Sequence, residues 1–268
     1  MDPIVQKKVQ DRELQILKEI DRICRLRHIR YCLCAGTLLG AVRHGGFIPW
    51  DDDIDIIMPR KDYERFAKEF MKYASDEYYL HTNKCDKKYS CLFYKVRLNG
   101  TKYGNERDKK LKHMGVWIDV FPLDFSNLSK FKFLKLIKRR NEVFTAYYAN
   151  LLLDRKKRTN KWKIITLLPK SFVKAIDILS MSILLKILSP QDIKSSEYCC
   201  ETFSTYNTNK VLYKSKEIMP FHPIKFCNLE TFAPRNEKYY LRTMYGDYMK
   251  LPPKEKRVTN HDITIIKL

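Results

Sequence analysis

Four aspartates lie within five residues in the segment Asp51-Asp52-Asp53-Ile54-Asp55. In an extended chain alternate side chains point to opposite faces, so Asp53 and Asp55 share one face while Ile54 points into the core. Two carboxylates about 6–7 Å apart repel by about 2–3 kcal/mol at an effective dielectric of about 20, and a bound cation removes that cost. Oxygen ligands favour Mg²⁺ or Mn²⁺ that also binds substrate phosphates. The segment therefore predicts a metal-dependent phosphoryl-transfer site.

The other two aspartates of this run have different expected roles. Asp52 is expected to point away from the metal and to solvate its loop. Asp51 is either a further metal ligand or the cap of a turn, and we keep it as a candidate ligand. Upstream, Gly36 permits close backbone approach, and Thr37 is expected to cap the next helix and, with the helix N-terminus, to supply donors for a phosphate.

Basic residues elsewhere in the chain are candidates for binding the phosphates of a donor substrate. These candidates are Arg43, Lys95, Arg97 and Arg257. Lys95 and Arg97 share one face of a predicted strand, which suits a diphosphate, although exposed strands also carry basic side chains for solubility. The basic tail over residues 254–261 is either solvated or closes over the substrate.

These residues require a mixed sheet flanked by helices to bring them together. Apolar spacing predicts helices over residues 4–29 and 60–73. Residue types predict strands over 31–34, 53–56, 77–81, 91–98 and 115–121, and a strand-like stretch and a helix near 224–232 and 235–245. We expect an α+β fold with a catalytic core over residues 1–125, a basic helical insertion over 126–210, and a segment over 211–268 that completes the core and the substrate site.

Composition limits the class of protein. The chain has 268 residues, 44% of them hydrophobic, and a formal net charge of +21, which indicates anionic partners such as nucleotides, an anionic membrane or nucleic acid. The eight cysteines show no C-x-x-C spacing, and no signal peptide is evident at Met1, so we expect reduced thiols and a cytoplasmic protein. The longest apolar stretch, over residues 175–188, contains two charged residues and is too short to span a membrane.

The run from Gly36 to Asp55 resembles the phosphate turn and D-x-D strand of polymerase-β type nucleotidyltransferases, which also use a third carboxylate on a later strand. Asp119 is the first candidate for that carboxylate and Asp124 the second. Together with the runs over 115–124 and 245–253, the chain resembles the LicD family, which includes relatives of fukutin-related protein, over nearly its whole length. The resemblance implies a nucleotidyltransferase-like fold.

The same resemblance implies an activity. A LicD-type phosphotransferase moves phosphocholine from CDP-choline, or a related alditol or amino-alcohol phosphate from a CDP-linked donor, onto a hydroxyl of teichoic acid, lipopolysaccharide, capsule or another glycan. Mg²⁺ or Mn²⁺ would be held by Asp53, Asp55 and Asp119, and Asp119 is also a candidate base. Since such acceptors are often lipid-linked, the basic helical insertion is expected to contact the inner face of the membrane peripherally.

Two other functions fit parts of the sequence. A nucleotidyltransferase that releases pyrophosphate would use the same metal ligands. A non-enzymatic nucleic-acid-binding module would explain the net charge, but the charge is concentrated away from the aspartates, so no nucleic-acid partner is expected.

Overall fold

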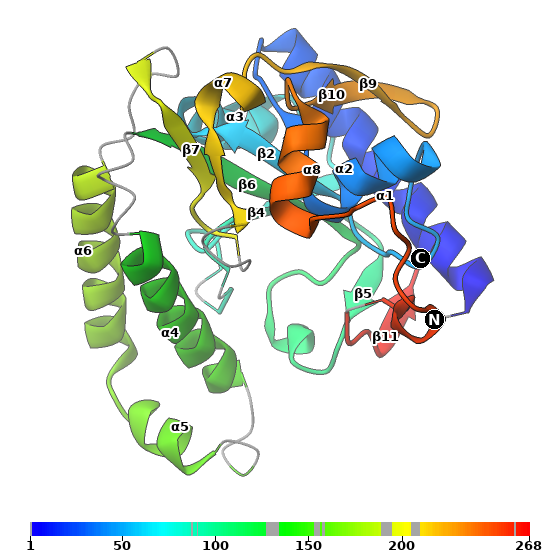
Figure 1. Ribbon diagram of the computed structural model, residues 1–268. Helices are drawn as coiled ribbons and strands as arrows, with labels where there is room; N and C mark the ends of the chain where they lie inside the picture. The colour runs from blue at the N-terminus through cyan, green and yellow to red at the C-terminus, as the bar shows by residue number, and fades with distance from the viewer. Residues whose placement is uncertain are drawn as a thin grey trace.

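A mixed sheet forms the centre of the molecule (Figure 1). The computed structural model describes residues 2–86, 88–89, 91–126, 134–152, 156, 159–188, 195–204, 210–259 and 261–268. Within these ranges the sheet has seven strands, and its main path runs β1-β2-β6-β4-β3. These strands are β1 (Cys32–Leu33), β2 (Asp55–Pro59), β6 (Trp117–Ser126), β4 (Tyr94–Leu98) and β3 (Tyr78–His81). The mixed sheet with flanking helices confirms the α+β class.

The long strand β6 organises the sheet. Along one edge it pairs in parallel with β2, and Asp55 lies opposite Asp119. Along the other edge it pairs antiparallel first with β4, where Lys95 lies opposite Asp119, and then with β7 (Tyr198–Glu201), where Glu201 lies opposite Leu123. Directly opposed residues place their side chains on the same face. Asp55, Asp119 and Lys95 therefore form one row, and Glu201 shares their face further along β6.

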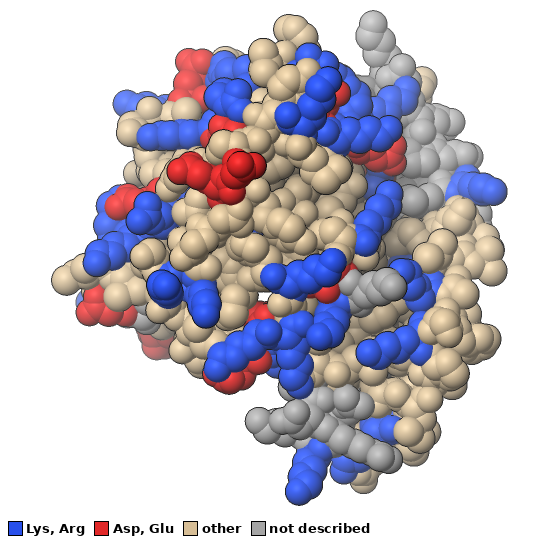
Figure 2. Space-filling view, turned by 180° about the vertical axis from the view of Figure 1, so that it is seen from behind, with Lys and Arg blue, Asp and Glu red and all other residues tan. Residues whose placement is uncertain are grey.

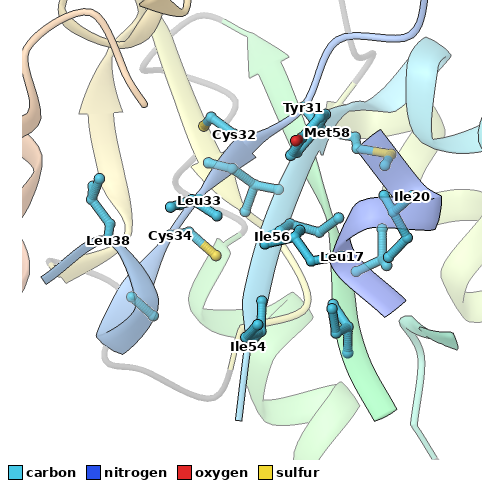
Figure 3. Close-up of a cluster of buried hydrophobic side chains, with 14 of the residues drawn as sticks. Leu17, Ile20, Tyr31, Cys32, Leu33, Cys34, Leu38, Ile54, Ile56 and Met58 are labelled. Carbon is cyan, nitrogen blue, oxygen red and sulfur yellow. The ribbon is translucent and has the colours of Figure 1, made fainter. Parts of the chain in front are cut away.

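Helices cover the sheet and bury its apolar side chains. Helix α1 (Pro3–Leu26) begins where the Asp2 side chain accepts hydrogen bonds from the amides of Ile4 and Val5. Figure 3 shows Leu17 and Ile20 of α1 beside Ile56 and Met58 of β2, with Cys32 and Leu33 of β1 across β2 from them. Each fully buried aliphatic side chain of this kind contributes about 1.5–3 kcal/mol.

Several predicted helices and strands are confirmed. Helix α3 (Arg60–Tyr73) has the predicted bounds and buries aromatic side chains spaced as one helical face requires. The C-terminal part contains the hairpin of β9 (His222–Phe226) and β10 (Leu229–Ala233), followed by α8 (Glu237–Tyr245). Three short elements complete it, namely β8 (Leu212–Lys214), α7 (Ser215–Ile218) and β11 (Ile265–Lys267), which pairs with β5 (Lys102–Gly104).

Two local expectations are wrong. The strand predicted over 53–56 begins only at Asp55, so Asp53 lies in the loop that leads into β2. Thr37 does not cap the next helix, because α2 (Ala35–His44) begins directly after β1, with Cys34 as its cap and Thr37 already in its first turn. The Thr37 hydroxyl instead accepts a hydrogen bond from the Asp55 amide at 2.8 Å, which ties α2 to β2.

The span 126–210 contains α4 (Leu134–Leu152), α5 (Asn160–Ile165) and α6 (Lys170–Leu188), with α4 and α6 side by side (Figure 1). Parts of this predicted insertion, at 127–133, 153–155, 157–158, 189–194 and 205–209, lie outside the described residues. Strand β7 also falls in this span and belongs to the central sheet. No helix in the described ranges combines the length and the apolar character that a membrane crossing needs.

Candidate active site

A cavity of about 590 Å³ opens over the row formed by Asp55, Asp119 and Lys95. Its walls come from the start of α2, the loop before β2, the strands β2, β4, β6 and β7, helix α8 and the C-terminal segment. The predicted site residues that line it are Gly36, Asp51, Asp53, Asp55, Lys95 and Asp119. The structure thus brings Gly36, the aspartate run and Asp119 of β6 to one cavity.

Lys95 and Asp119 form the closest charged pair of the cavity wall. The Lys95 ammonium lies 2.5 Å from Asp119 Oδ1, and both side chains are about nine-tenths buried. The ammonium also lies 4.3 Å from the ring centroid of Trp117. Burial strengthens this pair, because few water molecules screen it. A phosphate that enters the cavity therefore meets a fixed cation beside a carboxylate.

The remaining carboxylates of the cavity repel one another. Burial, reinforced by Asp53 and Asp119, raises the pKa of Asp55 well above its ordinary value. Burial and the neighbouring Asp53 carboxylate raise the pKa of Asp51 to about 8, and burial also raises the pKa of Asp53. Glu13 of α1 is buried nearby, and burial followed by the Asp53 charge raises its pKa as well. The cavity thus concentrates carboxyl groups inside a strongly basic protein.

Gly36 makes room for Asp51. A Cβ atom at position 36 would lie 2.8 Å from Asp51 Oδ2, so a larger residue would push this carboxylate out of place. The side chains of Gln6 and Gln10 both donate hydrogen bonds to the Asp51 carbonyl, at 3.0 and 2.9 Å. The loop before β2 is therefore held from two sides, by α1 and by the start of α2.

Four predicted phosphate-binding residues do not line the cavity. The Thr37 hydroxyl is engaged with the Asp55 amide, and Arg43 donates to the Tyr248 carbonyl at 2.7 Å. Arg97 is 3% exposed and donates to His81 Nδ1 and to the Gly115 carbonyl. Arg257 donates to the Pro252 carbonyl, and its guanidinium lies 5.6 Å from the Trp50 ring centroid. Each of these side chains holds backbone or neighbouring side chains around the site.

Asp52 does not solvate its loop, because its side chain is almost fully buried. It accepts hydrogen bonds from the Tyr103 hydroxyl at 2.5 Å and from the Thr259 hydroxyl, and it bonds His261 Nδ1 at 3.0 Å. Burial acts to raise the pKa of Asp52, but these three bonds outweigh burial and lower it. Asp52 therefore anchors the C-terminal segment at the edge of the cavity.

His261 was not among the predicted site residues, although the tail was expected either to be solvated or to close over substrate. Its ring lines the cavity, and Nε2 lies 3.7 Å from Asp53 Oδ2. Burial lowers the pKa of His261, but the Asp52 bond and the Asp53 charge raise it above the ordinary value. Nothing in the local sequence joins residue 261 to residue 53, so only the fold reveals this contact.

Asp124, the second candidate for the later carboxylate, lies elsewhere. It is fully buried, and it forms a two-point ion pair with Arg60 at 2.7 and 2.5 Å and a hydrogen bond with the Thr202 hydroxyl. It lies five positions after Asp119 on β6, so the two side chains point to opposite faces. Asp119 alone of the two lines the cavity.

The chemistry of the cavity fits a hard divalent cation. Asp53, Asp55 and Asp119 offer only oxygen donors, and the raised pKa values of Asp53 and Asp55 report a repulsion that a cation would relieve. Among the described residues, no three His, Cys, Asp or Glu side chains are arranged so that they could hold a metal ion. In this state Lys95 is the cation that neutralises Asp119.

Comparisons with known proteins agree with the motif. Residues 28–153 match the family model described as LicD/FKTN/FKRP, nucleotidyltransferase domain. The chain is 28% identical, over 92% of its own length and 92% of the relative's, to the lipopolysaccharide cholinephosphotransferase LicD of Haemophilus influenzae. It is also 30% identical to an uncharacterized protein of Rickettsia typhi, over 41% of this chain and 34% of that protein. Residues 28–153 thus form a LicD family domain.

Proposed function

We propose that this protein is a divalent-metal-dependent transferase that moves phosphocholine, or a related amino-alcohol or alditol phosphate, from a CDP-linked donor to a hydroxyl of a cell-surface glycan. The observation that carries the proposal is the row of Asp55, Asp119 and Lys95 on three adjacent strands below an acidic cavity. The relative named as a lipopolysaccharide cholinephosphotransferase supports phosphocholine as the transferred group and lipopolysaccharide as the acceptor.

Each residue of the row has a part in the proposed reaction. The acceptor hydroxyl oxygen bonds to the phosphorus of the transferred group, the bond from that phosphorus to CMP breaks, and CMP leaves. Lys95 places a buried positive charge where the phosphate oxygens gain negative charge. Asp119 is the candidate to accept the hydroxyl proton. Asp53, Asp55 and Asp119 would hold Mg²⁺ or Mn²⁺, which supplies Lewis acidity toward the phosphates.

A nucleotidyltransferase-like fold of the polymerase-β type is part of the same proposal. It is supported by the parallel pairing of β2 with β6, which sets Asp55 beside Asp119, and by the description of the matching family model. We retain the proposed division into a core over 1–125, an insertion over 126–210 and a completing segment over 211–268. In that division α4, α5 and α6 form the insertion, and β7 joins it to the core sheet.

The insertion is proposed to rest on an anionic membrane on the cytoplasmic side. Four of the exposed large apolar side chains of α6 lie at spacings of four, three and four residues and are each 43–62% exposed, namely Phe172, Ile176, Leu179 and Ile183. Lys186, in the last turn of α6, is exposed beside this stripe, so its charge complements anionic lipid headgroups. The side of the molecule that carries α6 is at the right in Figure 2, where tan surface predominates and Lys and Arg atoms lie beside it.

Product analysis tests the proposed reaction. The protein would be incubated with Mg²⁺, a glycan acceptor and a panel of CDP-linked donors that carry choline, ethanolamine, glycerol or ribitol. Release of CMP together with a phosphorylated acceptor supports the proposal. Release of pyrophosphate from a nucleoside triphosphate would instead identify a nucleotidyltransferase, and no product from any donor would reject the transferase.

A further inference from the structure

The cavity continues beyond the Asp119 row along the same face of the sheet. Side chains two residues apart on a strand share a face and lie about 6.6 Å apart. The next residue of β6 on this face is Phe121, and the one after it is Leu123, which lies opposite Glu201 of β7. Phe93 lies two residues before Lys95, directly ahead of the neighbouring strand β4. Phe93, Phe121 and Glu201 all line the cavity.

The two phenylalanines form a paired aromatic wall. Their ring centroids are 4.3 Å apart with the rings tilted by 41°, and both side chains are only partly buried. The Lys95 ammonium lies 5.4 Å from the Phe93 ring centroid, at the end of the wall that faces Asp119. An aromatic surface of this kind attracts a cation that carries methyl groups, because the ring faces are negative and the methyl groups pack against them.

Glu201 supplies a negative charge beside this wall. It is 2% exposed, and one of its oxygens, Oε1, accepts hydrogen bonds from the hydroxyls of Tyr240 at 2.6 Å and Tyr213 at 3.1 Å. No Lys, Arg or His side chain in the described part of the chain forms an ion pair with it. Burial raises its pKa, and the two tyrosine hydroxyls and the charge of Lys138 act against that shift. A buried carboxyl group that forms no direct ion pair within the described residues, in the wall of a cavity, fits a ligand that brings a positive charge.

We propose that Phe93, Phe121 and Glu201 form the subsite for the cationic head of the donor, a quaternary ammonium joined by a short carbon linker to the phosphate held at Asp119 and Lys95. Phe93 and Phe121 each lie two residues along the chain from Lys95 and Asp119, about 6.6 Å away, a distance that a two-carbon linker can cover. A quaternary ammonium donates no hydrogen bonds, so ring faces and a carboxylate are the groups that can select it. This inference depends on the proposed function, and the subsite would select choline among the CDP-linked donors.

The test compares a cationic donor with a neutral one. Phe93→Leu, Phe121→Leu and Glu201→Gln keep approximate volume, and Glu201→Gln keeps an acceptor for the two tyrosines. Each is expected to lower kcat/KM for CDP-choline about tenfold, mainly by raising KM, and to change kcat/KM for CDP-glycerol by no more than about twofold. Phe232→Leu is the control, because the Phe232 ring packs 5.5 Å from the Tyr31 ring, outside this cavity. It is expected to leave the ratio of kcat/KM for the two donors unchanged.

Binding measured without turnover separates this subsite from the proposed reaction. By calorimetry, the wild type should bind phosphocholine more tightly than glycerol phosphate, and the three variants should lose that preference while keeping their thermal unfolding temperature within a few degrees. If the wild type transfers phosphocholine but the variants keep the preference, the subsite is wrong and the function stands. If the wild type shows the preference but releases no CMP, the subsite stands and the function is wrong. Equal binding of both ligands by the wild type overturns the subsite.

Discussion

Lys95 and Asp119 lie directly opposite one another on β4 and β6, with 2.5 Å between Nζ and Oδ1, at the floor of the acidic cavity. Their pairing has two consequences for the proposed chemistry. The ammonium is fixed where the phosphate of a donor would enter, and it occupies the carboxylate that a divalent ion would also use. Lys95 thus both supports phosphate binding and competes with the ion for Asp119.

Lys95→Met is expected to separate these two effects. CMP release should fall on the order of 10²–10³-fold, because a buried charge that stabilises the reacting phosphate is lost. The Mg²⁺ concentration needed to stabilise the protein against heat should fall at the same time, since Asp119 loses its competing partner. Lys102→Met, at an exposed position of β5, is the matched control. An unchanged rate, or weaker stabilisation by Mg²⁺, contradicts the assigned role.

The raised carboxyl pKa values predict how stability depends on pH. The pKa of Asp51 rises from an ordinary 3.8 to about 8 on folding, so the folded state holds this proton more tightly than the unfolded state. The contribution of Asp51 to the stability of the protein is therefore greatest below pH about 4 and is lost as the pH rises toward about 8. Asp53 and Asp55, whose pKa values are also raised, act in the same direction.

Thermal unfolding with and without Mg²⁺ measures this dependence. The increase in Tm caused by Mg²⁺ should be larger at pH 8 than at pH 5, because the carboxylates that bind the ion are more fully ionised at pH 8. Asp51→Asn should reduce the fall in Tm between these pH values. A Mg²⁺ effect that is equal at both pH values would argue against an ion bound by this cluster.

Asp52→Ala is expected to destabilise the protein by about 3 kcal/mol, since it removes a buried carboxylate that accepts three side-chain hydrogen bonds. Chemical denaturation would give this free energy, and limited proteolysis should show earlier cleavage in the segment around His261. Asp11→Ala, at an exposed ion pair with Lys7, should cost less than about 1 kcal/mol. Equal stability of the two variants would mean that Asp52 does not anchor the tail.

Membrane contact through α6 can be tested by flotation with liposomes. The wild type should float with vesicles that contain an anionic lipid and less with neutral vesicles. Ile176→Ser with Leu179→Ser should abolish flotation, and Lys186→Glu should reduce the preference for anionic lipid. Met71→Ser, at an exposed apolar position of α3, serves as control. Absence of flotation by the wild type, or unchanged flotation by both α6 variants, rejects this contact.

The part of the site that sequence could predict depends on local periodicity. Alternation in the aspartate run correctly places Ile54 in the core and Asp55 toward the cavity, and the apolar context of Asp119 places it on a neighbouring strand. Asp53 also lines the cavity, but from the loop before β2. The bounds of α3 follow from its aromatic spacing. These features depend on residues close together in the chain, where spacing alone determines which side chains share a face.

The remainder depends on contacts between distant segments. Asp52 is buried because the tail residues Thr259 and His261 fold back onto it, and Glu201 reaches the cavity because β7 returns to pair with β6. Arg97 has the spacing of a second phosphate ligand, but His81 and Gly115 engage it instead. No pattern within a single segment records these pairings, so they could not be predicted.

Replacement of Asp55 by Asn is the most direct test of the proposed metal site at Asp53, Asp55 and Asp119. The variant keeps the volume of the side chain and removes one buried negative charge, so it should unfold at a temperature equal to or above that of the metal-free wild type. CMP release from the CDP-linked donor that the wild type uses, measured at saturating Mg²⁺, should fall by about 10³-fold or more. A folded Asp55→Asn protein that retains full turnover would contradict the assignment of this cavity as the active site.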